Sequence, residues 1–251
     1  TTEIYTLSLH DALPISSPMF MLRPDEIRQS IGPGRIARMA DFYRWHRQRT
    51  GILIEHDGSP TGGRWSFDTE NRKKLPPGLS IPRVSTAYPT RHVQAVSRLV
   101  AERFGDHPGT TEGFGWPTTR AGALRWLGHF VRHRLPQFGP YEDAISSRSD
   151  VLFHSRLSPL LNCGLLTPRE VVDRALRRRT EVPIESLEGF VRQIIGWREF
   201  VRGIDLLHGE RQAASNSWGH DRQLRPCWWT GSTGVAPLDD LIDGARRTGW
   251  A

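Results

Sequence analysis

The sequence predicts a mainly α-helical protein, and three stretches carry that prediction. In residues 185–203, apolar residues recur with the spacing of one face of a helix. Thr167, Pro168 and Glu170 form the expected cap and first turn of a helix that continues from Val171 to Arg179. A third apolar series begins at Thr119 and ends near Pro136. With 37% hydrophobic residues, the chain can bury a core between such helices.

The stretch from Glu185 to Gly203 has two faces. The face expected to pack on the core carries Leu187, Phe190, Val191, Ile194 and Val201. The neighbouring face carries Gly189, Gln193, Gly196, Trp197 and Phe200. Each interior glycine lowers helix stability by roughly 0.5 to 1 kcal/mol relative to alanine, so two of them indicate the close approach of a ring or another backbone. This face is either the floor of a ligand site or one side of a tightly crossed helix pair with a buried tryptophan.

The tract from His154 to Pro168 is rich in hydroxyl groups and leads into a helix. Ser155 and Ser158 offer hydroxyl donors, Arg156 adds a positive charge, and free amides at a helix start bind anions. These residue types suit a phosphate group. The Ser-Pro and Thr-Pro pairs are also ordinary helix starts, so the tract has a purely structural interpretation as well.

The chain is basic, with 34 lysines and arginines against 27 acidic residues and a formal charge of +7. Such a surface attracts the phosphate backbone of a nucleic acid. The positive charge concentrates in residues 44–49, 120–134 and 174–179. Lysine occurs only at Lys73 and Lys74, and an arginine bias of this kind also arises from genome composition. The charge therefore favours a nucleic-acid partner without requiring one.

The ends of the chain and its two cysteines bear on where the protein is located. Residues 1–16 lack the basic start and long apolar run of a signal peptide, and we expect them to be a non-native extension. No stretch approaches the roughly 20 apolar residues of a membrane span, so we expect a cytoplasmic protein without a membrane partner. Cys163 and Cys227 are expected to be free thiols in a reducing compartment. A further helix is predicted from Pro237 to Arg247.

Taken in order, several tracts resemble the photolyase and cryptochrome family. The similarity is greatest to its bacterial photolyase-related branch, which includes iron–sulfur (6-4) photolyases. The matching segments span residues 18–251 and are residues 62–73, 138–143, 154–168, 192–202 and 228–234. Several of them are long and share one order, so the resemblance is specific.

The resemblance implies a fold and a division into domains. Residues 91–251 would form a helical FAD-binding domain, truncated at its C-terminus, and residues 57–90 an interdomain connection. Residues 17–56 would be the C-terminal remnant of an N-terminal α/β antenna domain, with helices between Asp25 and Arg49 and a short strand from Ile52 to Glu55. The chain would then be an internal fragment with an incomplete flavin site.

The resemblance also implies roles for individual residues. Those expected to hold FAD are Tyr141, His154, Ser155, Arg156, Leu157 and Ser158. Those expected to contact a DNA lesion are Gln193, Trp197 and Arg198. Trp197 and Trp229 are expected to be catalytic, Trp197 against the flipped lesion and Trp229, with Trp228, in an electron path. The adjacent tryptophans 228 and 229 also suit a core position.

The implied activity is light-driven, FAD-dependent repair of UV-induced pyrimidine photoproducts in DNA, of the (6-4) type, by a monomeric lyase. A base inside a duplex must be flipped out to reach a buried flavin, and an aromatic side chain replaces its lost stacking. The flavin supplies the electron chemistry while the protein positions it. The full-length protein would have room for an antenna chromophore. No metal site and no iron–sulfur cluster are expected, because Pro237 stands where relatives have the first cluster cysteine.

Two other functions stay open at this point. A cryptochrome-type photoreceptor has the same fold and flavin but signals instead of repairing. A noncatalytic, basic helical module would bind RNA or DNA through Arg120 to Arg134 without a flavin.

Overall fold

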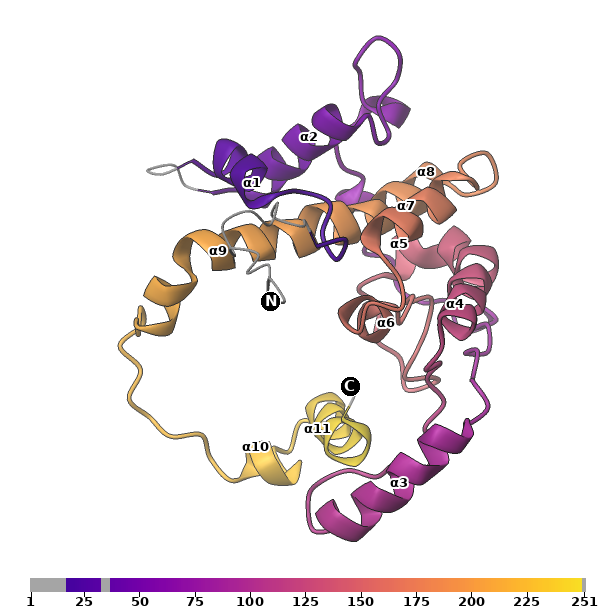
Figure 1. The fold of residues 1–251 in the computed structure, drawn as a ribbon, viewed down its shortest axis with the longest axis vertical. Coiled ribbons are helices and arrows are strands. Elements are labelled where there is room, and N and C mark those ends of the chain that lie inside the picture. The colour runs from indigo at the N-terminus through magenta and orange to yellow at the C-terminus, as the bar shows by residue number, and fades with distance from the viewer. Residues whose placement is uncertain (1–16, 33–36, 250–251) are drawn as a thin grey trace, which may run out of the picture.

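The computed structural model describes residues 17–32 and 37–249, and these residues form helices joined by irregular segments (Figure 1). The mainly α fold class is confirmed, whereas the predicted extension over residues 1–16 lies outside the described residues. The α-helices are α1 (Pro24–Ser30), α2 (Met39–Thr50), α3 (Arg91–Phe104), α4 (Arg120–His133), α5 (Phe138–Tyr141), α6 (Ser158–Asn162), α7 (Pro168–Leu176), α8 (Ile184–Val191), α9 (Glu199–Ala213), α10 (Cys227–Thr230) and α11 (Ala236–Thr248). The shorter helical turns are η1 (Thr61–Gly63), η2 (Asp68–Glu70), η3 (Leu135–Gln137) and the π-helical segment η4 (Arg192–Arg198).

The predicted helix starts are confirmed by their hydrogen bonds. At α7 the Thr167 hydroxyl accepts from the Glu170 amide at 3.4 Å, and the Glu170 carboxylate accepts from the Thr167 amide at 3.0 Å. This reciprocal capping box satisfies two amides that have no partner inside the helix. At α4 the Thr119 hydroxyl accepts from the Gly122 amide at 3.1 Å. Helix α7 ends at Leu176, slightly before the predicted end at Arg179.

The main hydrophobic core lies between α4, α7 and α8. Phe130 of α4, Phe138 of α5 and Phe190 of α8 meet there, with ring centroids 4.8 to 6.2 Å apart. Aromatic rings at such separations prefer the tilted and edge-on arrangements seen here. This cluster makes α8 the central helix and fixes the direction in which η4 leaves it.

A second cluster holds α1 and α2 against α9. The Arg202 guanidinium donates to the Leu22 carbonyl at 2.7 Å, and the buried Glu199 carboxylate accepts from the Met21 amide at 2.6 Å. The segment before α1 is thereby fixed over the start of α9. The helices predicted between Asp25 and Arg49 are confirmed as α1 and α2.

The predicted strand from Ile52 to Glu55 is wrong. The segment is a turn whose only strand-like feature, within the described residues, is an isolated bridge between Ile54 and Pro60. The buried Arg47 guanidinium explains the difference, because it donates to the carbonyls of Ile52, Leu53 and Trp65. These bonds occupy backbone acceptors that a neighbouring strand would use.

Beyond the start of α9, the chain extends away from the main core. Helix α9 leads outward, and the segment through α10 brings α11 back beside the end of α3, so that the ribbon outlines an open ring (Figure 1). The Thr110 amide donates to the Arg247 carbonyl at 2.9 Å at this junction. Helices α3, α10 and α11 contain no buried residue. The helix predicted from Pro237 to Arg247 is confirmed as α11.

Replacing Gly139 with alanine is expected to destabilise the contact between α5 and α8. An added Cβ would lie 2.7 Å from the Glu185 carbonyl oxygen and 2.8 Å from the Ser186 nitrogen, both of them backbone atoms. Overpacking of this kind lowers the free energy of unfolding by about 1 to 3 kcal/mol. Gly78→Ala is the control, because nothing lies within 4 Å of the Cβ it would add. Equal urea-unfolding curves for the two variants would contradict the close approach.

The stability of the fold is expected to fall between about pH 7 and pH 5 through His46. Its Nδ1–H donates to the Ile195 carbonyl at 2.8 Å, and burial lowers the pKa of His46 to about 4. Because the unfolded chain binds the proton more tightly, stability is present above the ordinary pKa of 6.5 and is lost as pH falls towards 4. Urea unfolding should show a loss of about 2 kcal/mol between pH 7 and pH 5. The non-titrating variant His46→Gln should lack this share of the pH dependence, and an unchanged pH profile in that variant would count against the assignment.

Candidate functional site

The segment η4 divides the predicted helix of residues 185–203 into three parts. Leu187, Phe190, Val191 and Ile194 are buried as predicted, but Val201 is 58% exposed. A π-helical turn contains an extra residue, and one residue rotates the following helix by about 100°. This rotation removes Val201 from the core face. It also changes the direction of every side chain from η4 onward.

The two glycines of this region admit protein side chains. A Cβ on Gly189 would lie 2.7 Å from the Asn71 amide nitrogen, and one on Gly196 would lie 3.3 Å from the Tyr43 ring. The predicted approach of a ring is confirmed at Gly196, whereas at Gly189 the approaching group is a side-chain amide, and at both positions the group belongs to the chain itself. Trp197 does not fit the crossed-helix interpretation, because 44% of its surface is exposed.

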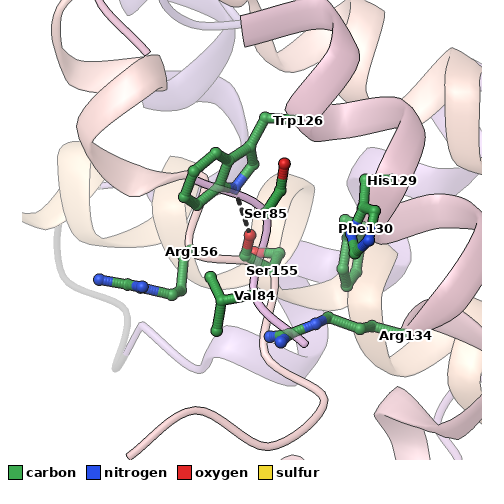
Figure 2. A pocket seen from close by; sticks show the side chains of 8 residues that line it. All are labelled: Val84, Ser85, Trp126, His129, Phe130, Arg134, Ser155 and Arg156. Atoms are coloured by element: carbon green, nitrogen blue, oxygen red, sulfur yellow. Dashed lines mark hydrogen bonds between the residues drawn. The ribbon is translucent and has the colours of Figure 1, made fainter. Parts of the chain in front are cut away.

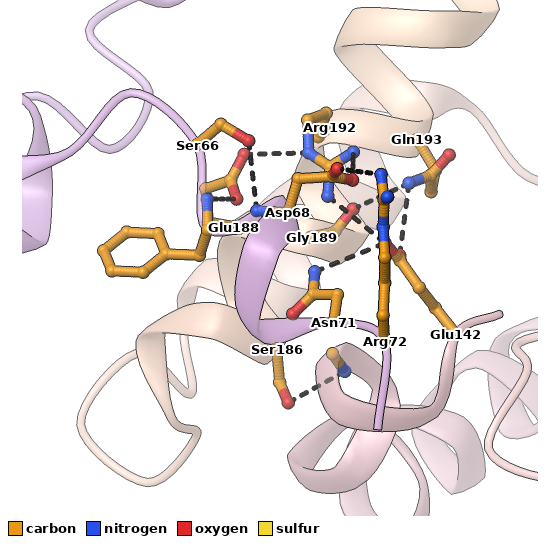
Figure 3. A network of polar contacts seen from close by, with 12 residues as sticks. Ser66, Asp68, Asn71, Arg72, Glu142, Ser186, Glu188, Gly189, Arg192 and Gln193 are labelled. Carbon is orange, nitrogen blue, oxygen red and sulfur yellow. Dashed lines mark hydrogen bonds and ion pairs between the residues drawn. The ribbon is translucent and has the colours of Figure 1, made fainter. Parts of the chain in front are cut away.

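The feature that anchors η4 is a buried arginine bonded to three carboxylates, which we call the Arg192 cluster (Figure 3). Arg192 Nη1 lies 3.1 Å from Asp68, Nη2 lies 3.2 Å from Glu142, and Nε lies 3.2 Å from Glu188. Glu142 also accepts from the Asn71 amide at 3.3 Å, and Glu188 accepts from the backbone amide of residue 67 at 2.9 Å. The cluster therefore ties the connection at residues 67–71 to α5, α8 and η4.

In the Arg192 cluster, burial and the neighbouring charges shift the pKa values of the ionisable groups in opposite directions. Burial raises the pKa of Glu142, while the Arg192 guanidinium and the Asn71 amide act in the opposite direction. Burial alone would lower the pKa of Arg192, but Glu188, Glu142 and Asp68 together raise it above its ordinary value. A cation in this position is needed to balance carboxylates that have been removed from water.

The Arg192 cluster also fixes the side chain of Gln193. Its Nε2 donates to the Glu142 carboxylate at 3.2 Å and to the Gly189 carbonyl at 3.3 Å. Both partners are acceptors, so the amide orientation is determined and Oε1 is the atom left to interact with another group. Figure 3 shows this oxygen on the side away from the cluster. Four residues later, Trp197 lies with its ring edge-on to Phe200 at 6.2 Å.

Arg198, predicted to contact a lesion, makes its contacts within the protein. Its Nη1 donates to the Met19 carbonyl at 2.6 Å, and its guanidinium lies 4.2 Å from the Phe20 ring centroid. Arg202 lies at the same distance from that ring. The structure therefore places Arg198 against the segment before α1.

The residues predicted to hold a cofactor form one neighbourhood around α5 and the start of α6. The buried Tyr141 ring packs on Phe153 with centroids 5.4 Å apart. His154 Nε2–H donates to the Glu142 carbonyl at 2.9 Å, which joins the tract to the residue after Tyr141. Leu157 is buried in the main core, whereas Ser158 is exposed at the first position of α6.

Arg156 forms a sharp turn in this tract. Its φ of 53° lies in the left-handed region, which is uncommon for a residue with a side chain. The guanidinium lies 4.3 Å from the Trp116 ring centroid, and Trp126 Nε1–H donates to the Ser155 carbonyl at 3.2 Å (Figure 2). The turn thus rests on two stacked tryptophans.

A small cavity beside this turn is lined by Ser155 and Arg156 and by six residues that were not predicted to belong to a site. Its volume is about 10 Å³, and it is lined by Val84, Ser85, Trp126, His129, Phe130, Arg134, Ser155 and Arg156 (Figure 2). The buried Arg134 donates to the carbonyls of His154 at 3.3 Å and Pro82 at 2.7 Å. Burial, with Arg156 nearby, lowers the pKa of Arg134 to about 10. A cavity of this size admits about one water molecule.

Trp229, predicted to be catalytic, lies in a different part of the chain. It is 67% exposed on the short helix α10, next to the partly exposed Trp228. Figure 1 shows α10 across the open ring from α8. The described residues therefore do not bring Trp229 together with Trp197, and neither tryptophan of the pair is a core residue.

Comparison with known proteins identifies the family. The family described as deoxyribodipyrimidine photo-lyase-related protein matches residues 4–116. A (6-4) photolyase of Agrobacterium fabrum is 39% identical over 238 residues, which are 94% of this chain and 47% of the relative. A deoxyribodipyrimidine photo-lyase of Thermus thermophilus is 29% identical over 136 residues, 51% of this chain and 30% of its own length. A cryptochrome DASH of Ostreococcus tauri is 28% identical over 106 residues, 39% of this chain and 19% of its own length.

These matches, together with the helical fold, define a photolyase-type protein. The chain belongs to the photolyase-related family. It spans about half the length of the (6-4) photolyase it matches. In the described part of the chain, no helix is both long and apolar enough to cross a membrane.

Replacing Arg192 with methionine is expected to disrupt the Arg192 cluster. The substitution keeps much of the side-chain volume but leaves the buried carboxylates of Glu142 and Glu188 without their cation, whereas Asp68 keeps its ion pair with Arg72. Removing one partner of a buried ion pair costs about 3 to 5 kcal/mol. Urea unfolding measures the loss. Arg177→Met is the control, because Arg177 is exposed after the end of α7. A loss no larger than that of the control would show that the cluster does not hold η4 in place.

Proposed function

We propose that the chain is part of a light-driven, FAD-dependent enzyme that repairs UV-induced pyrimidine photoproducts in DNA, of the (6-4) type. The observation that carries the proposal is that Trp197 and Gln193 lie on the same π-helical segment, which the Arg192 cluster anchors. Within that segment, one side chain offers a half-exposed ring and the other a free acceptor oxygen. The similarity to a (6-4) photolyase along nearly the whole chain supports the same function.

Trp197 would bind the flipped base by stacking. A lesion removed from the duplex loses its neighbours, and an aromatic side chain restores about 1 to 3 kcal/mol per base. The indole is accessible enough to be covered by a ligand, and its contact with Phe200 restricts its motion. The Arg192 cluster anchors the same segment and keeps its backbone in one place.

Gln193 would select the group that faces it. Because both of its amide hydrogens are donated within the protein, Oε1 can only accept a hydrogen bond. The imide N–H of a pyrimidine ring is a donor of the required kind. A carbonyl presented to the same oxygen would be left without a partner, which disfavours binding.

The residues around α5 and α6 fit a flavin nucleotide in their chemistry. The exposed Ser158 hydroxyl and the Arg156 guanidinium are donors suited to a diphosphate, and the left-handed turn at Arg156 sets their directions. Tyr141 and His154 hold this turn against α5. Bound FAD would supply the light-driven electron, and the residues of the chain would orient it and exclude water.

A cryptochrome-type photoreceptor is the second candidate, favoured by the similarity to a cryptochrome DASH over residues that make up 39% of the chain. The noncatalytic basic module has less support. Of the arginines of its proposed surface, Arg120 pairs with Glu170 and Arg134 is buried. These two charges are therefore engaged in contacts within the protein and not displayed for a nucleic acid.

The test combines flavin binding, lesion binding and light. The purified chain, supplied with FAD, should retain flavin absorbance after gel filtration and should bind duplex DNA with one (6-4) lesion more tightly than undamaged duplex. Trp197→Ala should weaken lesion binding by about 1 to 3 kcal/mol without reducing flavin content. Trp218→Ala, which removes an exposed indole outside the site, is the control.

The outcomes separate the candidate functions. Light-dependent restoration of the pyrimidines supports repair, whereas flavin retention without repair in light favours the photoreceptor. DNA binding without flavin favours the noncatalytic module. Equal lesion affinities for the Trp197→Ala and Trp218→Ala variants would contradict the role of Trp197.

A further inference from the structure

A basic hollow lies on the surface beside the Arg192 cluster. One wall is formed by residues 72–75 and the other by residues 143–146, and the hollow has a volume of about 570 Å³. Three of its lining residues are the consecutive cations Arg72, Lys73 and Lys74, and Asp143 is its one carboxylate. The chain has no other lysines. Positive charge therefore dominates the hollow.

The three cations differ in their partners. Arg72 is paired with Asp68 at 2.6 Å, as Figure 3 shows. Lys73 and Lys74 are exposed, and among the described residues neither ammonium group has a hydrogen-bond or ion-pair partner. Two adjacent, unpaired ammonium groups leave a local excess of charge that an anion would neutralise.

Both walls of the hollow are fixed to each other. At one end the Lys73 amide donates to the Pro140 carbonyl at 3.0 Å. At the other end the Arg148 guanidinium donates to the carbonyls of Pro76, at 3.0 Å, and of Leu79. A hollow held at both ends is pre-organised, so a ligand does not have to order it on binding.

The lining also offers apolar surface. Ile145 is 78% exposed, and Leu75 is partly exposed on the opposite wall. The Ser146 side chain adds a hydroxyl group to the lining. A nucleic-acid strand presents phosphate groups that alternate with apolar sugar faces, and cations beside aliphatic side chains match that alternation.

The hollow adjoins the proposed lesion site through Glu142. The Glu142 side chain holds Gln193, and the next residue, Asp143, lines the hollow. A DNA strand that presents a flipped base to Gln193 has flanking phosphates that need a cationic surface nearby.

We propose that the basic hollow binds the phosphodiester backbone of the DNA strand beside the flipped base, with Lys73 and Lys74 as its phosphate contacts. This inference rests on the proposed function, because it assigns the hollow to the same DNA substrate. Lys73 and Lys74 are binding residues in this scheme and take no part in the chemistry.

The test measures how salt affects DNA binding. The Lys73→Gln/Lys74→Gln chain is compared with wild type and with Arg177→Gln/Arg179→Gln, which removes the same charge from exposed positions after α7. Fluorescence anisotropy over a salt series gives the slope of log affinity against log salt for lesion-bearing and undamaged duplexes. Each phosphate contact contributes about 0.9 to that slope on duplex DNA. The lysine pair should lower the slope by about 2, with both duplexes affected, and the arginine pair should leave it unchanged.

Two results for the variants would overturn the inference. One is an unchanged slope in the lysine variant, and the other is an equal reduction in the two double variants, which would reflect net charge alone. Absence of DNA binding by the wild-type chain would also overturn it. Flavin content, measured on the same samples, keeps the two proposals apart. If the chain binds DNA through the two lysines but holds no flavin, the proposed binding role of the hollow stands and the proposed flavin-dependent activity is refuted. If the chain repairs DNA with flavin and the lysine variant has an unchanged slope, the proposed activity stands and the binding role of the hollow is refuted.

Discussion

The arrangement of the molecule depends on Arg192 and the carboxylates of Asp68, Glu142 and Glu188. These four residues come from η2, the end of α5, α8 and η4, and so one buried cation joins segments that are far apart in the sequence. Because charges removed from water are stable only when paired, the cluster permits little variation in how these segments meet. The connection at residues 67–71 is thereby held against α5, α8 and η4.

The Arg192 cluster also explains the properties of η4. A π-helical turn is less favourable than an α-helical one, and such turns occur often at functional sites. Here Gly189 and Gly196 allow Asn71 and Tyr43 to approach, and the cluster fixes the Gln193 amide. The extra residue of η4 leaves Trp197 partly exposed, although it follows a buried stretch of helix. The exposed ring and the fixed acceptor oxygen are consequences of the same packing.

The features that could be predicted from the sequence are those that depend only on residues close together in the chain. The capping box at Thr167 and Glu170 and the buried face of α8 need only local information, and both are confirmed. The strand at Ile52 to Glu55 failed because Arg47 takes its carbonyls, which no local pattern reveals. The spacing of Glu188 and Arg192 is that of a helical ion pair and could have indicated the cluster, but its other partners are distant in sequence.

The central claim is that η4 presents Trp197 to a base flipped out of DNA. The most direct measurement is the fluorescence of Trp197, obtained as the difference between the emission of wild type and that of Trp197→Phe. Emission would be recorded before and after adding duplex DNA with a single (6-4) lesion, and again with undamaged duplex. The account predicts that the lesion-bearing duplex quenches the Trp197 emission and that the undamaged duplex leaves it nearly unchanged. Trp197 emission that responds equally to the two duplexes, or to neither, would contradict the claim.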